Sequence, residues 1–586
     1  MFKLFKNFTK RDFLFIFIIF CFIVASVWLE LKMPDYMSAI TRLVQTEGSK
    51  MNDILEQGGY MLICALGSLV CAVIVGYLSA KVASSFSQTL RAKIFVKVEN
   101  FGIEEIKKFQ TSSLITRTTN DVTQIEMLVA MGMQLIMRSP VMAIWAITKI
   151  LDKSIEWSML TGACVVILLV TIGILMSIVM PRFKKIQKLI DQINGVTREN
   201  LTGIRVIHAF NAENYQKNRF EEVNGGLTKM LLFNQRCFAI MMPMMNIVMH
   251  SLTLGIYLIG SSLIHSAMMS DKITIFSNMV VFSSYGMQVI MSFLMLAMIF
   301  MILPRASISA NRINEVLDSS IAIQDGKFDG ETKLKGTIEF KNVSFKYPDA
   351  DEYLLKNISF KVDRGQTIAF IGSTGSGKST LINLVPRFYD VTDGEILVDG
   401  VNVKEYKEET LYNKIGYVPQ KAVMFTGTVS SNVTYGDNGK EKPSLEQIKK
   451  AIEVAQGTDF VEKMENTYDA HIARGGTNVS GGQKQRLAIA RAIARDPEIY
   501  IFDDSFSALD YKTDATLRKE LKKYTKDATN MIVAQRIGTI IHADKIVVLE
   551  KGECVGIGTH KELLKNCEVY KEIALSQLSK EELENA

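Results

Sequence analysis

Six long apolar runs are the feature of this sequence that most restricts its fold. A helix needs roughly 20 mostly apolar residues to cross a bilayer. The runs that approach or reach this length lie at 13–29, 58–80, 128–150, 157–180, 238–264 and 278–303. The first run could instead be a signal peptide, but five further runs follow it and disfavour that alternative. The sequence therefore predicts an all-α polytopic membrane domain of six transmembrane helices over residues 1–305.

The charges outside the apolar runs predict the orientation of this domain. Lys3, Lys6, Lys10 and Arg11 precede the first run, and basic residues at that place favour a cytoplasmic N-terminus. Six crossings would return the chain to the cytoplasm, so the C-terminus is expected there too. The segments after the second and fourth runs are long, basic and helically periodic, which predicts long cytoplasmic extensions of the helices. We expect a multi-pass protein of the cell membrane, surrounded by the lipid bilayer.

One ionisable residue lies inside an apolar run. Arg138 falls within the third run, two residues before Pro140. A cation at that depth either faces a cavity or a partner, or extends its side chain to the membrane interface. The sequence favours neither alternative.

The net charge and the cysteines argue against nucleic-acid binding and against a disulfide framework or a zinc site. A net charge of +6 in 586 residues is too small to indicate nucleic-acid binding. The seven cysteines are scattered and include no CxxC pair, which indicates unpaired thiols rather than a disulfide framework or a zinc site.

The hydropathy falls after Arg305, and a second domain is expected. Residues 306–336 are polar and indicate a linker, and strand-like residues begin near Thr337, so the second domain should span 337–586. Its strongest pattern is "TIAFIGSTGSGKSTLINLV", in which an apolar strand, a complete GxxxxGKS loop and a helix follow one another. Glycines allow backbone N–H groups to surround phosphate oxygens at a helix N-terminus. Lys378 is expected to reach the β- and γ-phosphates and Ser379 to ligate Mg²⁺. The pattern predicts an α/β P-loop ATPase domain with ATP and Mg²⁺ as cofactors.

Two adjacent carboxylates end another apolar strand, "IYIFDD". Burying a carboxylate without a partner is costly, so the pair indicates a cation nearby. Asp503 is expected to hold the same Mg²⁺, as in other P-loop ATPases. Asp504 then lies where a general base for the attacking water is expected.

A second phosphate-binding pattern follows the P-loop in the chain. In "NVSGGQKQRLAIARAIA", residues Ser480, Gly481, Gly482 and Gln483 open a predicted helix, whose N-terminus also suits phosphate. We call these four residues the signature segment. One ATP needs only one glycine cradle, so the second cradle predicts that two nucleotide domains face each other.

Together these residues resemble an ATP-binding cassette (ABC) exporter of the half-transporter type, in which six spans precede one nucleotide-binding domain. The motifs "GSTGSGKS", "VSGGQ", "IYIFDD" and "SALD" carry the resemblance, which extends over essentially the whole chain. It implies that Gln420 in "GYVPQ" contacts Mg²⁺, that Asp510 communicates across the dimer, and that the signature segment contacts the partner's ATP. The ATP-binding residues that it implies are Tyr347 (stacked on adenine), Gly372, Ser373, Thr374, Gly375, Ser376, Gly377, Lys378, Ser379, Thr380 and Gln420. The turns near "SSLITRT" and "GIRVIHAF" are similar to the family's coupling helices.

The sequence departs from the family pattern at two catalytic positions. The residue after the strand aspartate is normally Glu but here is Asp504, and the switch histidine is replaced by Gln535. Asp is one methylene shorter than Glu, so its carboxylate would lie about 1 Å or more farther from the attacking water. A displacement of that size can cost about 10²-fold in rate. Gln can donate a hydrogen bond to a phosphate but cannot carry a proton or a positive charge.

This pattern resembles the degenerate-site subunit of a heterodimeric multidrug exporter. We therefore expect ATP-driven export of small amphipathic or lipophilic compounds with a second half-transporter, a heterodimer being favoured, and weak hydrolysis at this chain's own site. One alternative is a homodimeric lipid or peptide exporter with a slow Asp-based ATPase. Another is an ATP-gated regulator or channel.

Overall fold

The computed structural model describes residues 2–46, 48–151 and 154–578. The chain divides into two compact units. The N-terminal unit comprises Met1–Asn100 and Phe109–Ser319, and the C-terminal unit comprises Ser320–Ala586 together with the short segment Phe101–Lys108.

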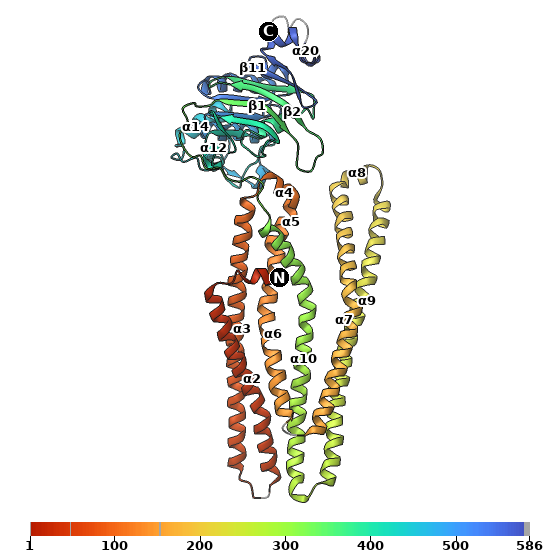
Figure 1. Ribbon diagram of the computed structural model, residues 1–586. Coiled ribbons are helices and arrows are strands. Elements are labelled where there is room, and N and C mark those ends of the chain that lie inside the picture. The colour runs from red at the N-terminus through yellow and green to blue at the C-terminus, as the bar shows by residue number, and fades with distance from the viewer. Residues whose placement is uncertain (1, 47, 152–153, 579–586) are drawn as a thin grey trace. The chain divides into compact units, whose positions relative to one another are not determined.

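The N-terminal unit is helical (Figure 1). In the part of the chain that the structure describes, six helical stretches are long and apolar enough to cross a membrane, which confirms the predicted polytopic helical fold. The long helices are α2 (Lys10–Gln45), α3 (Met51–Glu99), α6 (Val122–Leu151), α7 (Ile155–Thr202), α9 (Glu213–Ser266) and α10 (Met269–Asp318). At 1.5 Å per residue the 54 residues of α9 extend about 80 Å, far beyond a hydrocarbon core of about 30 Å. The helices therefore continue well outside the apolar runs.

Short elements connect the long helices. They are α1 (Phe2–Phe5), α4 (Ile103–Phe109), α5 (Thr111–Thr116), a π-helical turn (Arg117–Asp121) and α8 (Ile204–Ala209). Helices α7 and α9 lie side by side, and α8 lies at the end of this pair (Figure 1).

Helix α10 crosses the boundary that hydropathy placed at Arg305. It continues to Asp318, and the apolar side chains of Ala306, Ala310, Ile313 and Val316 are buried along this extension. The segment 306–336, expected to be a linker, is thus helical in its first part. These small and β-branched side chains recur at helical spacing, with polar residues between them. Because mean hydropathy averages over both faces of a helix, it does not reveal the buried apolar face.

A six-stranded sheet in the order β12-β11-β3-β10-β9-β6 forms the centre of the C-terminal unit. All neighbours are parallel except β11 and β12, which pair antiparallel at one edge. The strands are β3 (Thr367–Gly372), β6 (Ile415–Val418), β9 (Ile499–Asp503), β10 (Thr529–Val533), β11 (Lys545–Glu550) and β12 (Glu553–Gly558). Every residue of β9 and β10 is buried, as expected for parallel strands that are covered on both faces.

Smaller elements surround this sheet. A four-stranded antiparallel sheet contains β1 (Ile338–Phe345), β2 (Leu355–Val362), β4 (Asp393–Val398) and β5 (Val401–Asn402), and a two-stranded one contains β7 (Gly427–Thr428) and β8 (His471–Ile472). The α-helices are α11 (Lys378–Asn383), α12 (Glu408–Asn413), α13 (Val429–Val433), α14 (Leu445–Val454), α15 (Thr458–Val461), α16 (Gly481–Ala494), α17 (Tyr511–Tyr524), α18 (Ile537–Ile540), α19 (His560–Asn566) and α20 (Glu568–Leu575).

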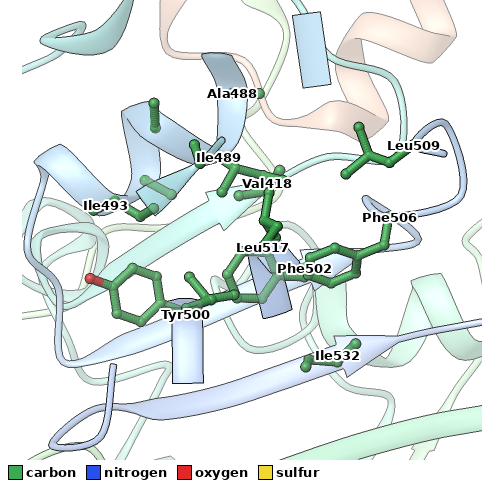
Figure 2. Packing of buried hydrophobic residues seen from close by; sticks show 14 of the residues in the cluster. Val418, Ala488, Ile489, Ile493, Tyr500, Phe502, Phe506, Leu509, Leu517 and Ile532 are labelled. Carbon is green, nitrogen blue, oxygen red and sulfur yellow. The ribbon is translucent and has the colours of Figure 1, made fainter. Parts of the chain in front are cut away.

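The core of this unit joins α16, the helix that the signature segment opens, to β9, the strand that ends at Asp503. Ile489 and Ile493 of α16 lie in one buried cluster with Tyr500 and Phe502 of β9 (Figure 2). Each of these side chains is at most 1% exposed. Burying such a side chain contributes roughly 1.5–3 kcal/mol, so the start of α16 and the end of β9 are held on one rigid body.

Candidate functional site

Four neighbouring parallel strands end at the same edge of the central sheet, where ligands bind in open α/β sheets. The P-loop follows β3, Gln420 follows β6, Asp503 ends β9 and Gln535 follows β10. A cavity of about 720 Å³ lies at this edge, and its lining includes Gly372–Gly375, Gly377–Thr380, Gln420, Asp504 and Gln535. The structure thus brings together residues that are far apart in the sequence.

The backbone of the P-loop leaves no space for side chains at its first glycine. A Cβ atom at Gly372 would lie 2.0 Å from the carbonyl oxygen of Leu549. Gly377 has φ +93° and precedes α11, so the loop enters the helix through a left-handed residue that glycine adopts without strain. This compact loop presents backbone N–H groups at a helix start, which fits the triphosphate of ATP.

Lys378 folds back over the same loop. Its Nζ donates to the carbonyl oxygens of Gly372 at 2.9 Å and Ser373 at 2.7 Å. Burial lowers the pKa of Lys378, while Asp504 and Asp503 act in the opposite direction. A triphosphate in the cavity would supply the negative charge that this half-buried ammonium lacks.

Ser379 and Asp503 lie where Mg²⁺ is expected. Ser379 Oγ donates to Asp503 Oδ1 at 2.7 Å, and Asp503 is 5% exposed. Burial raises the pKa of Asp503, so the carboxylate would be stabilised by a cation. The donors are hard oxygens, which suit Mg²⁺. Among the described residues no group of three His, Cys, Asp or Glu could hold a metal.

Asp504 is held by two glutamine amides. Its Oδ2 accepts from Gln535 Nε2 at 2.7 Å and from Gln420 Nε2 at 3.3 Å. Its backbone has φ +47°, in the left-handed region that is uncommon for non-glycine residues. The residue is 7% exposed, and both amide donors lie on one carboxylate oxygen, Oδ2.

A residue that sequence reasoning did not identify supports Gln535. Gln577, just after α20, donates from Nε2 to the backbone oxygen of Gln535 at 2.8 Å. Its Oε1 accepts from the backbone N–H of Ile537 at 2.8 Å. No local sequence pattern marks this glutamine, because its partners lie about 40 residues earlier in the chain.

Tyr347 reaches the start of α11 with its hydroxyl. The hydroxyl lies 2.9 Å from Thr380 Oγ1, within hydrogen-bond distance. Its ring contacts Phe345 and Tyr389 edge to face, with centroids 5.0 and 5.3 Å apart. The aromatic predicted to stack on adenine therefore lies beside the helix that the P-loop opens.

The signature segment lies outside this cavity. Among the described residues, none of Ser480, Gly481, Gly482 and Gln483 belongs to the cavity lining. Ser480 caps α16: its Oγ accepts from the Gln483 backbone N–H at 3.3 Å, and Gln483 Oε1 accepts from the Ser480 N–H at 2.9 Å. Asp510 caps α17 at an exposed position, and its bonds to Thr513 lower the pKa of the Asp510 carboxyl.

Arg138 has a partner inside the N-terminal unit. Its Nη2 lies 2.7 Å from Oε1 and 2.8 Å from Oε2 of Glu30 on α2. Ser68 of α3 donates to the same Glu30 at 2.9 Å. This ion pair answers the question that the sequence left open: the guanidinium faces a partner helix.

A second ion pair joins the same two helices. Lys149 Nζ of α6 lies 2.9 Å from Asp35 Oδ2 of α2, and Tyr285 of α10 donates to Asp35 Oδ1 at 2.7 Å. Neither acid interrupts an apolar run, because Glu30 and Asp35 follow the first one, so the sequence did not mark them as partners of the basic residues. The sequence did contain a signal for these ion pairs: two acids follow the first apolar run, and two basic residues lie inside the third.

Two protein-family models match the chain. The ABC transporter transmembrane region matches residues 15–293, and the ABC transporter model matches residues 355–507.

Known proteins resemble the chain along nearly its whole length. An uncharacterized ABC transporter ATP-binding protein of Mycobacterium tuberculosis is 37% identical over 550 residues, covering 92% of this chain and 93% of the relative. The ATP-dependent lipid A-core flippase of Mannheimia succiniciproducens is 31% identical over 520 residues, covering 89% and 87%. The structure of a bacterial Atm1-family ABC exporter with ATP bound has a TM-score of 0.78 at 21% identity, over 97% of this chain and 99% of that one. That likeness shows a shared fold.

Proposed function

The chain belongs to the ABC transporter family, and from that premise we propose that it is one half of a heterodimeric exporter of amphipathic or lipophilic compounds. The family and its exporter relatives support an ATP-hydrolysing membrane exporter. The proposal adds the partner, the division of labour between two ATP sites, and the class of cargo.

The contact between Asp504 and Gln535 is the observation that carries the proposal. A general base must direct a carboxylate oxygen at the attacking water. In Asp504 the side chain is one methylene shorter than Glu, and two amides hold it in place through Oδ2. Gln535 has no group that can take up a proton or bear a positive charge. The site retains the P-loop, Lys378 and the Mg²⁺ residues, so we infer that it binds ATP and hydrolyses it slowly.

The position of the signature segment supports a two-chain arrangement. Ser480–Gln483 opens a helix of 14 residues with a capped N-terminus, and it does not line the cavity of its own unit. A helix start stabilises negative charge. We infer that it completes the ATP site of the partner, and that the partner's equivalent segment completes the site at Lys378.

Helix α8 gives the N-terminal unit an apolar surface that needs a partner. Val206 of α8 and Phe210 directly after it are 61% and 78% exposed. Neighbouring apolar side chains that are exposed together mark interaction sites more often than single exposed apolar side chains do. On the C-terminal unit, Phe425 and Tyr435 stack at 4.0 Å and both are more than 40% exposed. We infer that α8 docks on the corresponding aromatic pair of the partner, which agrees with the coupling role expected for "GIRVIHAF".

The test is to co-purify the chain with its partner and to compare ATPase activity across variants. In the complex, Asp504→Asn should leave the rate nearly unchanged, whereas Ser480→Asp should abolish most of it, because this chain's signature segment serves the competent site. High activity of the chain alone, lost in Asp504→Asn, would contradict the heterodimer proposal.

One observation favours a second candidate. The similarity to a lipid A-core flippase supports a lipid as the amphipathic cargo. The second candidate is accordingly a homodimeric lipid exporter with a slow Asp504-based ATPase. Crosslinking through a cysteine introduced at Asp510 separates the two, because a dominant self-pair in cells would favour the homodimer.

A further inference from the structure

A short segment of the membrane-spanning half belongs to the C-terminal unit. Residues Phe101–Lys108 lie in sequence between α3 and α5, yet they cluster with the ATPase domain. Glu105 anchors this segment: its Oε1 accepts from the backbone N–H of Ala322 at 2.8 Å, and the residue is 4% exposed. Helix α4 is therefore a fixed part of the unit that holds the candidate nucleotide site.

Lys107 of α4 lies over the aromatic ring that is proposed to stack on adenine. Its Nζ is 4.9 Å from the ring centroid of Tyr347 and 5.5 Å from that of Tyr389. Both distances are within the range of a cation–π interaction. The Tyr389 hydroxyl raises the pKa of Lys107, while burial acts in the opposite direction, so the ammonium is charged at neutral pH.

The position of Tyr347 makes this contact relevant to nucleotide binding. Its hydroxyl is 2.9 Å from Thr380 Oγ1, and Thr380 lines the cavity that holds the P-loop. A base attached to a triphosphate in that cavity would reach the Tyr347 ring. An ammonium over a ring and a base stacked on it both need a ring face, and they exclude each other when they use the same one.

We propose that Lys107 and the adenine base compete for the Tyr347 ring, so that Lys107 lowers the affinity for ATP and is released from the ring when ATP binds. The proposal rests on the proposed ATP site and deepens it. It makes a residue of the membrane half a determinant of nucleotide affinity.

The surroundings of Lys107 can receive the displaced ammonium. Glu104 lies three positions earlier on α4, a spacing at which opposite charges attract. Asp349 also acts on Lys107 by charge attraction. A cavity of about 260 Å³ lined by Glu104, Tyr347 and Tyr389 provides space for the movement.

The competition would also report nucleotide occupancy to the membrane helices. Helix α4 ends at Phe109 and α5 begins at Thr111, from which the chain continues through the π-helical turn into α6. Release of Lys107 removes one contact that holds α4 in place. Binding of the base and the position of this segment are therefore linked, and the linkage is reciprocal.

The experiment measures binding of two Mg²⁺-complexed ligands, ATP and inorganic tripolyphosphate, to the purified full-length protein in nanodiscs. Lys107→Met should tighten ATP binding about two- to fivefold, the range expected for loss of an exposed cation–π contact. It should leave tripolyphosphate binding unchanged, because that ligand has no base. Lys107→Arg keeps a cation over the ring and should resemble the wild type.

Lys108→Met is the matched control, since it removes the same charge from the neighbouring position of α4. Weaker ATP binding in Lys107→Met would overturn the proposal, because Lys107 would then assist the base. Equal changes for ATP and tripolyphosphate would overturn it too, because the effect would act at the phosphates. A separate variant tests the proposed ATP site on which this inference rests. If Tyr347 does not stack on the base, Tyr347→Ala will leave ATP binding unchanged.

Discussion

Gln535 donates its side-chain amide to Asp504, with Nε2 2.7 Å from Oδ2, in the candidate ATP site. The two residues stand where the ABC family normally has a histidine and a glutamate. The shorter acid and the amide fit each other, so the two departures from the family pattern form one interaction. Under the proposed function, this pairing is the structural reason for expecting slow hydrolysis at a site with a complete P-loop.

Restoring both side chains should restore catalysis at this site. In a complex whose partner cannot hydrolyse ATP at its own site, Asp504→Glu combined with Gln535→His should raise the ATPase rate by about ten- to a hundredfold, because a displacement of about 1 Å costs about that much. Steady-state phosphate release measures the effect. An unchanged rate, with ATP binding intact, would show that something other than these two positions limits hydrolysis.

The P-loop should tolerate alanine very differently at two glycines. Gly372→Ala places a Cβ 2.0 Å from the Leu549 carbonyl oxygen and should abolish nucleotide binding. Gly375 has open space around its Cβ position but φ +85°, so Gly375→Ala should cost only about 1–3 kcal/mol of backbone strain. Nucleotide binding and thermal unfolding of the two variants check this order, and equal losses would contradict it.

Ser480 should have two separable roles. Ser480→Ala removes the N-cap of α16 and should lower stability by about 0.5–2 kcal/mol. Ser480→Asp preserves a good cap, so its thermal unfolding should match the wild type, yet its charge should repel a triphosphate bound by the partner. The complex carrying Ser480→Asp should therefore lose ATPase activity without losing stability. A stable, fully active Ser480→Asp complex would argue against a role in the partner's site.

The ion pair between Glu30 and Arg138 should matter most when only one partner is removed. Arg138→Met leaves Glu30 without its cation and should destabilise the protein by about 1–3 kcal/mol, less than for a fully buried pair because the Arg138 side chain is 34% exposed. Adding Glu30→Gln removes the stranded charge and should recover most of that loss. Thermal unfolding in detergent gives both values. A double variant as unstable as Arg138→Met alone would mean that the pair does not act as a unit.

Much of the fold and of the candidate site could be predicted from local patterns. The apolar runs identified the helices because length and composition alone decide whether a helix can cross a bilayer. The P-loop and the start of α16 could be predicted because their glycines and the capping serine determine the conformation and hydrogen bonds of backbone groups only a few residues away. Local patterns failed at 306–318, where a buried helical face lies among polar residues. They also failed at α4, because nothing in its seven residues reveals with which unit it packs.

The sequence by itself thus determined the spans, the phosphate-binding loop and the acidic strand end, since each depends on residues close together in the chain. The tertiary structure alone decided which side chains meet. Glu30 and Arg138 form an ion pair although they are 108 positions apart in the sequence. Gln420 and Gln535, which follow two other strands, both donate to Asp504. Contacts of this kind depend on strand order and helix packing, which place distant residues at one sheet edge or one helix interface.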